Sequence, residues 1–346
     1  MPDSPLRVGL VGAGVFGRNH ARVYRDVAAD PAQNVQFVGV VDADLTRAQV
    51  VAQEFTTQSF GSVSALIAAG VDAASVAVPT VAHLPVAREL MQSGIDVIIE
   101  KPLCTTLAEA DELQAVAQQY GRIVQVGHLE RFNPAVRATL PLLTQPMFFE
   151  VHRLSVFTPR SLDVDVVLDL MIHDIDIVLT MAQSPVKEVR AVGLPILSKK
   201  VDIANVRLEF ESGCVANFTA SRVSTERVRK LRFFQPRQYV SLDFSRQDVL
   251  VLTVDHTAAV EDDPFNPASM VASALPGITP FKPKVDPIEP LRAELLSFLN
   301  AVRARGTTEV PLEQGRNALA LALQIVDAIA DHSRRAHLEE LTGGVS

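Results

Sequence analysis

The stretch Val8-Gly9-Leu10-Val11-Gly12-Ala13-Gly14-Val15-Phe16-Gly17 decides the fold of the first part of the chain. An apolar strand pattern runs into Gly-x-Gly-x-x-Gly, and a helical pattern follows. In this setting Gly12 permits a tight turn, Gly14 lets backbone N–H groups approach a pyrophosphate, and Gly17 lets the helix pack closely on the strand. The anion would lie at the positive end of the helix. The stretch therefore predicts a dinucleotide-binding turn.

The strand pattern at residues 35–41 ends in Asp42. A carboxylate at this place accepts hydrogen bonds from the two hydroxyls of an adenosine ribose. It repels the additional phosphate of NADP at close range. The sequence therefore favours NAD as the cofactor, although Arg47 is close enough to weaken this preference.

Strand and helix patterns alternate along the first third of the chain. Strands are expected at 6–11, 35–41, 72–78, 95–99 and 122–126, and helices include 82–93 and 107–120. The strand patterns are continuous apolar runs, which are typical of parallel strands covered on both faces. Residues 1–128 are therefore predicted to form an α/β Rossmann domain with a doubly wound parallel sheet.

The pattern changes after residue 128. A helix at about 165–182 is followed by expected strands at 186–193, 201–210, 214–222, 229–235, 238–244 and 248–254. Period-two alternation with short turns predicts an open, mainly antiparallel sheet. Frequent prolines predict a long loop over about 255–287, and helices are expected near 288–304 and 312–335. Residues 129–346 are thus expected to form a second α/β domain.

Composition narrows the class of protein. The 346 residues are 48% hydrophobic and 21% charged, as in soluble globular enzymes, and the net charge is −8. This charge and the absence of a basic run argue against nucleic acid or an anionic membrane as partner. No apolar run is long enough to span a bilayer, and the N-terminus lacks signal-peptide features. With only Cys104 and Cys214, far apart, we expect a cytoplasmic protein.

Three residues could carry acid–base chemistry. Lys101 follows the strand pattern at 95–99, and ligands of open α/β sheets bind beyond the carboxyl ends of the strands. Asp169 and His173 lie four residues apart in a helical pattern, and a histidine beside a carboxylate suits proton transfer near neutral pH. Position alone is also consistent with a surface lysine and a structural helix pair.

A metal site is a further alternative for this helix, because Asp174 and Asp176 are also possible ligands. However, Asp174 points to another face of the helix, and no second histidine stands at a metal-binding spacing. We therefore expect no metal.

The motifs Gly12-x-Gly14-x-x-Gly17, Glu100-Lys101-Pro102 and Asp169-x-x-x-His173 occur in the order and at the separations of a known family. Over nearly its whole length the chain resembles the glucose–fructose oxidoreductase, inositol dehydrogenase and rhizopine-catabolism (Gfo/Idh/MocA) family. The resemblance implies a Rossmann domain followed by an α/β domain whose open sheet forms the oligomer interface, and hence a homodimer or homotetramer. It also implies NAD-dependent hydride transfer at a secondary alcohol of a sugar-like molecule.

The resemblance assigns a Lys–Asp–His set to Lys101, Asp169 and His173. In this interpretation neutral His173 removes the hydroxyl proton, Lys101 stabilises the developing alkoxide, and Asp169 orients one of them. Whether Lys101 or His173 accepts the proton is left open, because a coupled pair can share this role.

The resemblance extends to segments beside the cofactor and the substrate. The loop at 79–83 matches the family's segment beside the nicotinamide ribose, and residues 127–134 match the segment that borders the substrate. We expect the cofactor to be bound by Gly12, Gly14, Val15, Phe16, Gly17, Asp42, Pro79, Thr80, His83, Glu100 and Lys101. We expect the substrate to be bound by Lys101, His128, Arg131, Asn133, Arg160, Asp169 and His173.

The chain departs from the family at Val164-Asp165, where Gly-Gly is frequent, and this changes the backbone near the substrate. The forms of residues 128–134 and 161–165 are similar to the branch that contains UDP-N-acetylglucosamine 3-dehydrogenases of lipid A precursor synthesis. Those enzymes oxidise the sugar 3-hydroxyl to a ketone, which a separate aminotransferase aminates. A sugar nucleotide carries a diphosphate, for which the candidate cations are Arg153, Arg160, Arg222, Arg229, Lys230 and Arg232.

Two other functions are consistent with the sequence. One is an NAD-dependent dehydrogenase of a free sugar or inositol. The other is an NAD-bound sensor without turnover, because fold does not determine function. The presence of Lys101, Asp169 and His173 together argues against the sensor.

Overall fold

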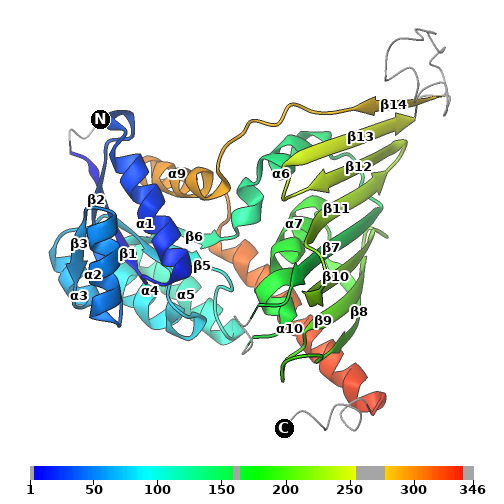
Figure 1. Cartoon of the computed structure of the whole chain (residues 1–346), viewed down its shortest axis with the longest axis horizontal. Helices are drawn as coiled ribbons and strands as arrows, with labels where there is room; N and C mark the ends of the chain where they lie inside the picture. Colours follow the sequence, from blue (N-terminus) through cyan, green and yellow to red (C-terminus); the bar gives the residue numbers. More distant parts are fainter. Residues whose placement is uncertain (1–3, 159–163, 255–276, 338–346) are drawn as a thin grey trace. The chain divides into compact units, whose positions relative to one another are not determined.

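The computed structural model describes residues 4–158, 164–254 and 277–337 (Figure 1). The chain divides into two compact units. The first contains Met1–Leu129 and Glu289–Ala320, and the second contains Glu130–Ile288 and Leu321–Ser346. Residues 289–320, which we expected in the second domain, thus belong to the first unit.

The first unit is built on a six-stranded parallel sheet with the order β3-β2-β1-β4-β5-β6. The strands are β1 Leu6–Val11, β2 Val35–Val41, β3 Gln58–Phe60, β4 Ala73–Val76, β5 Asp96–Glu100 and β6 Val124–Gly127. Every residue of β4, β5 and β6 is buried, as the apolar runs predict. The expected doubly wound sheet is confirmed, with β3 as a further short edge strand.

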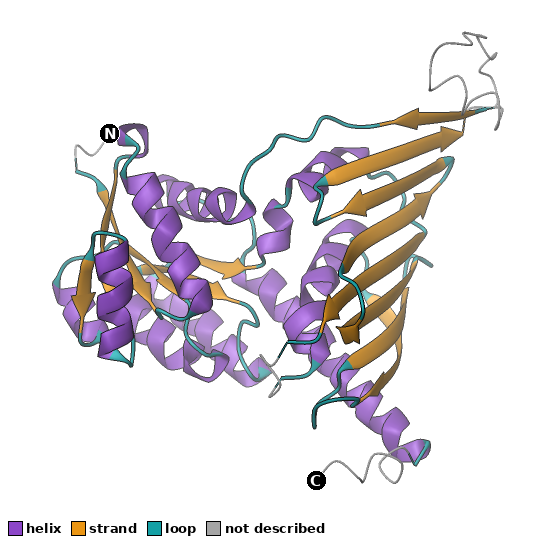
Figure 2. Ribbon diagram, viewed as in Figure 1, coloured by secondary structure: helices purple, strands orange, loops and turns teal. Residues whose placement is uncertain are grey.

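Helices cover both faces of this sheet (Figure 2). They are α1 Val15–Ala28, α2 Leu45–Glu54, α3 Val63–Ala68, α4 His83–Gln92, α5 Leu107–Tyr120 and α9 Pro290–Ala304. Short 3₁₀ turns lie at Pro31–Gln33 and Thr80–Ala82. Local sequence sets the ends of α5: Thr106 and Glu109 form a capping box, and Gly121 ends the helix in the left-handed region.

The helix α9 explains why residues 289–320 belong to the first unit. Its apolar side chains, among them Leu295 and Phe298, share one core cluster with Val8, Tyr24 and Ile98. Burial of this apolar face stabilises the first unit rather than the second. The last helix, α10 Leu312–Arg335, begins in the first unit and ends in the second.

The second unit contains an eight-stranded sheet with the order β14-β13-β12-β11-β7-β10-β9-β8. The strands are β7 Phe148–Val156, β8 Val186–Leu194, β9 Ile203–Phe210, β10 Val215–Ser224, β11 Val228–Gln235, β12 Gln238–Asp243, β13 Asp248–Val254 and β14 Ile278–Phe281. All neighbours are antiparallel except β7 and β10. This confirms the expected open, mainly antiparallel sheet.

Helices cover one face of the second sheet (Figure 1). They are α6 Pro134–Thr139, α7 Ile172–Ala182, which continues a π-helical turn, Val167–Met171, and the C-terminal part of α10, whose Ile329 lies against Gly193 of β8. Short 3₁₀ turns lie at Leu129–Phe132 and Leu140–Leu142. Alternation along β9 buries Ala204, Val206 and Leu208 and leaves Asn205, Arg207 and Glu209 on the other face.

The loop expected at about 255–287 is partly corrected. Residues 278–281 form the edge strand β14, because Ile278–Phe281 pair with Val251–Val254 of β13. Residues 255–276 lie outside the described part of the chain. Within the described ranges, no helix combines the length and apolar composition needed to cross a bilayer.

Candidate active site

The glycine-rich turn between β1 and α1 is closely packed on one side and open on the other. Gly12 has φ +103°, and a Cβ there would lie 2.2 Å from the carbonyl oxygen of Ala77. A Cβ at Gly17 would lie 1.9 Å from the carbonyl oxygen of Gly12. A Cβ at Gly14 would meet no atom within 4 Å. The turn thus requires Gly12 and Gly17 for its packing, and its open side faces outward at the N-terminus of α1.

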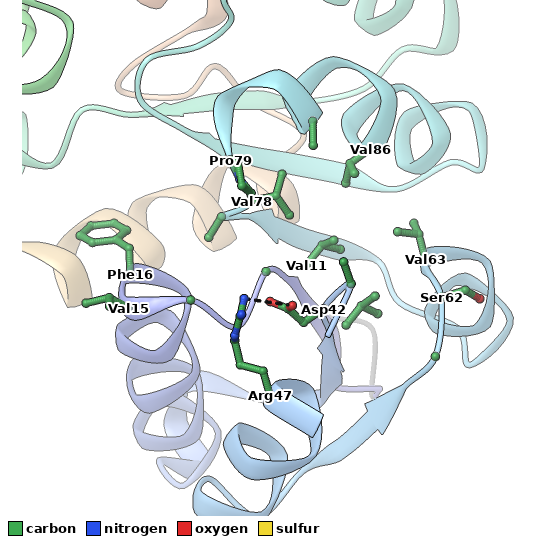
Figure 3. Close-up of a pocket in the computed structure, with 17 residues that line it drawn as sticks. Val11, Val15, Phe16, Asp42, Arg47, Ser62, Val63, Val78, Pro79 and Val86 are labelled. Carbon is green, nitrogen blue, oxygen red and sulfur yellow. Dashed lines mark hydrogen bonds and ion pairs between the residues drawn. The ribbon is translucent and has the colours of Figure 1, made fainter. Parts of the chain in front are cut away.

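A cavity of about 580 Å³ lies against this turn (Figure 3). Such a volume is in the range of cofactor and ligand pockets. It is lined by Val11, Gly12, Gly14, Val15, Phe16, Val41, Asp42, Ala43, Arg47, Gly61, Ser62, Val63, Ala77, Val78, Pro79, Ala82 and Val86. Six residues expected at the cofactor are in this set, while Gly17, Thr80, His83, Glu100 and Lys101 are not. The open turn, the N-terminus of α1 and the carboxylate of Asp42 directly after β2 fit a bound dinucleotide.

Asp42 lies at the end of β2 and lines the cavity. Its Oδ2 accepts a hydrogen bond of 2.7 Å from the backbone N–H of Ala13, and its Oδ1 accepts one of 2.9 Å from that of Asp44. The guanidinium of Arg47 lies 3.3 Å from the same Oδ1, as Figure 3 shows. Asp42 therefore supports the glycine turn and holds Arg47 beside the expected ribose position.

His83 joins the loops that follow β4 and β5. Its Nδ1 lies 3.1 Å from the carbonyl oxygen of Leu103, and its Nε2 lies 3.0 Å from that of Val78. Burial lowers the pKa of His83, so the neutral imidazole donates to one of the two carbonyls. This histidine braces the ends of two strands. The half-buried Lys101 follows Glu100, the last residue of β5, at the same edge of the sheet.

Asp169 and His173 lie on successive turns of one continuous helical segment in the second unit. Asp169 belongs to the π-helical turn, His173 to the first turn of α7, and both side chains are partly exposed. The expected helix is confirmed from residue 167, but its π-helical start was not expected. Single π-helical turns occur frequently at functional sites.

The segment before Asp169 is held by the loop that precedes β9. The Oδ1 of Asp165 accepts a 2.9 Å hydrogen bond from the N–H of Val201, and the N–H of Val166 donates to the carbonyl of Val201 at 3.0 Å. Arg222 donates to the carbonyl oxygen of Val164. The departure from Gly-Gly at Val164-Asp165 thus gives this chain an anchor that a glycine could not supply.

The helix α7 is anchored by buried ion pairs. Arg153 of β7 binds both oxygens of Asp174 at 2.7 Å and contacts Glu130 at 3.0 Å. Arg131 binds both oxygens of Asp176 at 2.6 and 2.9 Å. Burial disfavours the charge on Arg153, but the two facing carboxylates outweigh it and raise its pKa. Asp174 and Asp176, two of the possible metal ligands, are therefore engaged with arginines.

Several residues expected at the substrate have structural contacts. Arg131 holds Asp176, and Asn133 caps α6 while its amide donates to Glu130 at 3.0 Å and to the carbonyl of Phe244 at 3.1 Å. His128 is buried directly after β6. Arg160 lies outside the described residues. A role of these residues in binding substrate stays a prediction.

The described candidate cations for a diphosphate lie on different faces of the second sheet. Arg153 and Arg222 are buried and engaged, while Lys230 and Arg232 share the uncovered face of β11, as their alternation predicts. Arg229 has the parity of the buried Leu231 and lies directly opposite Arg153. Among the described residues, Arg229 has no hydrogen-bonded or ion-paired acidic partner.

Comparison with known proteins agrees with this architecture. Residues 6–128 match the model of an oxidoreductase family with an NAD-binding Rossmann fold, and residues 145–237 match the GFO/IDH/MocA C-terminal domain. The chain is 35% identical to UDP-N-acetylglucosamine 3-dehydrogenase of Acidithiobacillus ferrooxidans over 325 residues, which cover 94% of this chain and 97% of that protein. The solved structure of an enzyme of that name from the same organism has a TM-score of 0.83 and covers 93% of this chain and 97% of the other.

A more distant relative acts on another class of alcohol. Inositol 2-dehydrogenase of Acidothermus cellulolyticus is 31% identical over 199 residues, which cover 55% of this chain and 57% of that protein. The two family models together with the relative that matches over nearly its full length settle the membership. The chain belongs to the GFO/IDH/MocA oxidoreductases and is an NAD-dependent sugar dehydrogenase of that family.

Proposed function

We propose that this enzyme oxidises the 3-hydroxyl of UDP-N-acetylglucosamine to a ketone during the synthesis of lipid A precursors. The observation that carries the proposal is the 35% identity, over nearly the full length of both chains, with the dehydrogenase of that name. The inositol dehydrogenase, by comparison, matches just over half of this chain. The full-length match includes the second unit as well as the cofactor-binding unit.

We propose that Lys101, Asp169 and His173 serve one reaction. Bound NAD supplies the hydride acceptor. Neutral His173 removes the hydroxyl proton, the ammonium of Lys101 stabilises the alkoxide, and Asp169 orients one of these two groups. General-base assistance of this kind contributes about 10²–10⁴-fold.

Arg229 is the described cation best suited to a diphosphate in the second unit. It lies on the helix-covered face of the sheet, beside the Arg153–Asp174–Glu130 cluster, and retains an exposed surface. Burial and the neighbouring Arg153 lower the pKa of Arg229. A bound phosphate would offset both unfavourable effects through charge-assisted hydrogen bonds. Arg160, expected in the same role, stays a second candidate.

The assembly and the compartment are also proposals. The uncovered face of the second sheet presents polar side chains from several strands, including Glu150, Arg207 and Arg232. We propose that it forms the contact of a homodimer or homotetramer in the cytoplasm. Both cysteines are buried free thiols, as a reducing compartment allows.

The proposal is tested by offering the enzyme and NAD three alcohols: UDP-N-acetylglucosamine, free N-acetylglucosamine and myo-inositol. We expect NADH to form with the sugar nucleotide, and NMR of the product to place the ketone at the third carbon. Arg229→Ala should raise KM for the nucleotide about tenfold, equivalent to about 1.4 kcal/mol. Arg246→Ala, at an exposed turn, is the matched control.

Two results would contradict this function. Faster oxidation of myo-inositol or of the free sugar would favour a dehydrogenase of free polyols. Binding of NAD without turnover of any of the three alcohols would favour a non-catalytic sensor.

A further inference from the structure

A chain of four buried polar side chains crosses the core of the first unit. The hydroxyl of Tyr24 lies 2.6 Å from the Oγ of Ser75. That Oγ lies 3.0 Å from the Nδ1 of His20, and the Nε2 of His20 lies 3.0 Å from the Oε1 of Glu100. Tyr24, Ser75 and His20 have no exposed surface, and Glu100 is buried. Polar groups buried in this way normally have a structural or functional reason.

The donors and acceptors of this chain are determined by its ends. The carboxylate of Glu100 can only accept, so the Nε2 of His20 donates to it. In the neutral imidazole this donation selects the tautomer whose Nδ1 accepts the hydroxyl proton of Ser75, and the oxygen of Ser75 then accepts from Tyr24. Burial raises the pKa of Tyr24, which keeps its phenol protonated as a donor. Each contact has one donor, and the network fixes one tautomer and one ring orientation of His20.

The network connects the phosphate-binding helix to the strand that precedes Lys101. His20 lies on α1, whose N-terminus begins at the glycine turn. Ser75 lies in β4, and Glu100 is the last residue of β5. The carboxylate is also confined from β6, because a Cβ at Gly127 would lie 2.7 Å from Oε1 of Glu100. Neither His20 nor Glu100 lines the described cavity, so a place in the cavity wall does not explain their contacts across three elements.

We propose that His20 is a positioning residue: through Glu100 it fixes the carboxyl end of β5, and with it Lys101, relative to the dinucleotide phosphates at the N-terminus of α1. The inference rests on the role proposed for Lys101 above. Its physical basis is that hydride and proton transfer depend on sub-ångström placement, which a buried hydrogen bond between two elements can maintain.

Two substitutions of His20 separate its two hydrogen bonds. The amide nitrogen of His20→Gln corresponds to Nε2 and can still donate to Glu100, whereas that of His20→Asn corresponds to Nδ1 and reaches only the Ser75 side. We expect His20→Asn to lower kcat about 10²-fold, with the dissociation constant of NAD unchanged, and His20→Gln to retain most of kcat. Equal losses in both variants would overturn the proposal, because the contact with Glu100 would then be irrelevant.

The acceptor provides an independent variant. Glu100→Ala removes the same hydrogen bond from the other side, so it should lower kcat to the extent that His20→Asn does. The double variant should be no slower than the slower single variant, because both changes remove one interaction. Effects that add in the double variant would contradict a shared role. Melting curves establish that each variant is folded at the assay temperature.

Chemical labelling of Lys101 needs neither cofactor nor substrate, so it tests the role of His20 independently of the proposed function. Lysines of the cofactor-free protein are acetylated with acetic anhydride. Peptide mass spectrometry then compares the acetylation rate of Lys101 with that of the exposed Lys187. We expect His20→Asn and Glu100→Ala to change the relative rate of Lys101, and His20→Gln to leave it as in the wild type. An unchanged rate in His20→Asn would overturn the proposal even if the substrate were correctly identified, and a wrong substrate would leave this result untouched.

Discussion

Asp42 shows how one side chain can shape a binding site and restrict its ligand. Its two oxygens are occupied by the backbone N–H groups of Ala13 and Asp44 and by the guanidinium of Arg47. The arginine is held by the same carboxylate that repels an additional phosphate. Preference for NAD therefore depends on the acid in two ways: through direct repulsion and through restraint of a cation.

We predict that Asp42→Ser shifts the cofactor preference toward NADP. The serine removes the negative charge and frees Arg47 to bind the additional phosphate, so kcat/KM should rise with NADP and fall with NAD. The ratio of the two should change by about 10–10²-fold, since charge-assisted hydrogen bonds contribute about 1.5–3 kcal/mol. Steady-state kinetics with both cofactors measure this ratio.

The control is the double variant with Arg47→Ala. Compared with Asp42→Ser, the double variant should lose the increase in kcat/KM with NADP, because the cation that binds the additional phosphate is gone. Its kcat/KM with NAD should stay as low as in Asp42→Ser. If the double variant used NADP as well as Asp42→Ser does, Arg47 would have no part in cofactor choice.

The buried ion pairs of α7 act at the scale of elements. They connect α7 to β7 and to the 3₁₀ turn Leu129–Phe132, and so fix the helix that carries His173. Such pairs contribute little net stability compared with apolar packing, yet removing one partner leaves a buried charge uncompensated.

We predict that Asp174→Ala destabilises the protein by about 3–5 kcal/mol, because the guanidinium of Arg153 loses its bidentate partner in the core. Urea unfolding measures the change. The matched control is Lys187→Ala, which removes an exposed pair with Glu209 and should leave the unfolding midpoint unchanged. A loss in Asp174→Ala no larger than that of the control would show that the buried pair does not anchor α7.

The elements that could be predicted from sequence are those with a continuous pattern. The apolar runs predict β1, β2, β4, β5 and β6, and period-two alternation predicts β8 to β13. The strand β7 was missed because its buried face carries Arg153, which a hydrophobic pattern treats as a solvent residue. The edge strand β3 has only three residues and no apolar run.

The contacts of the candidate site could be predicted only in part. The glycine turn and Asp42 follow from local sequence, because turn geometry and the end of a strand determine them. Arg131 and its partner Asp176 lie 45 residues apart in sequence, and only the tertiary fold brings them together. His20 illustrates the same limit: its helical position was predictable, but its contact with Glu100, 80 residues away, was not.

At the scale of the whole molecule, the proposed catalytic residues are divided between the two units. Lys101 belongs to the first unit, and Asp169 and His173 belong to the second. We propose that Lys101 and His173 act in one proton transfer coupled to hydride transfer, so removing either side chain should slow the reaction.

The experiment that decides whether both side chains take part is single-turnover oxidation of UDP-N-acetylglucosamine by the NAD-bound enzyme. We expect Lys101→Met and His173→Ala each to slow the formation of NADH about 10²–10⁴-fold, while NAD still binds as in the wild type. Near-normal rates in both variants would contradict the proposal.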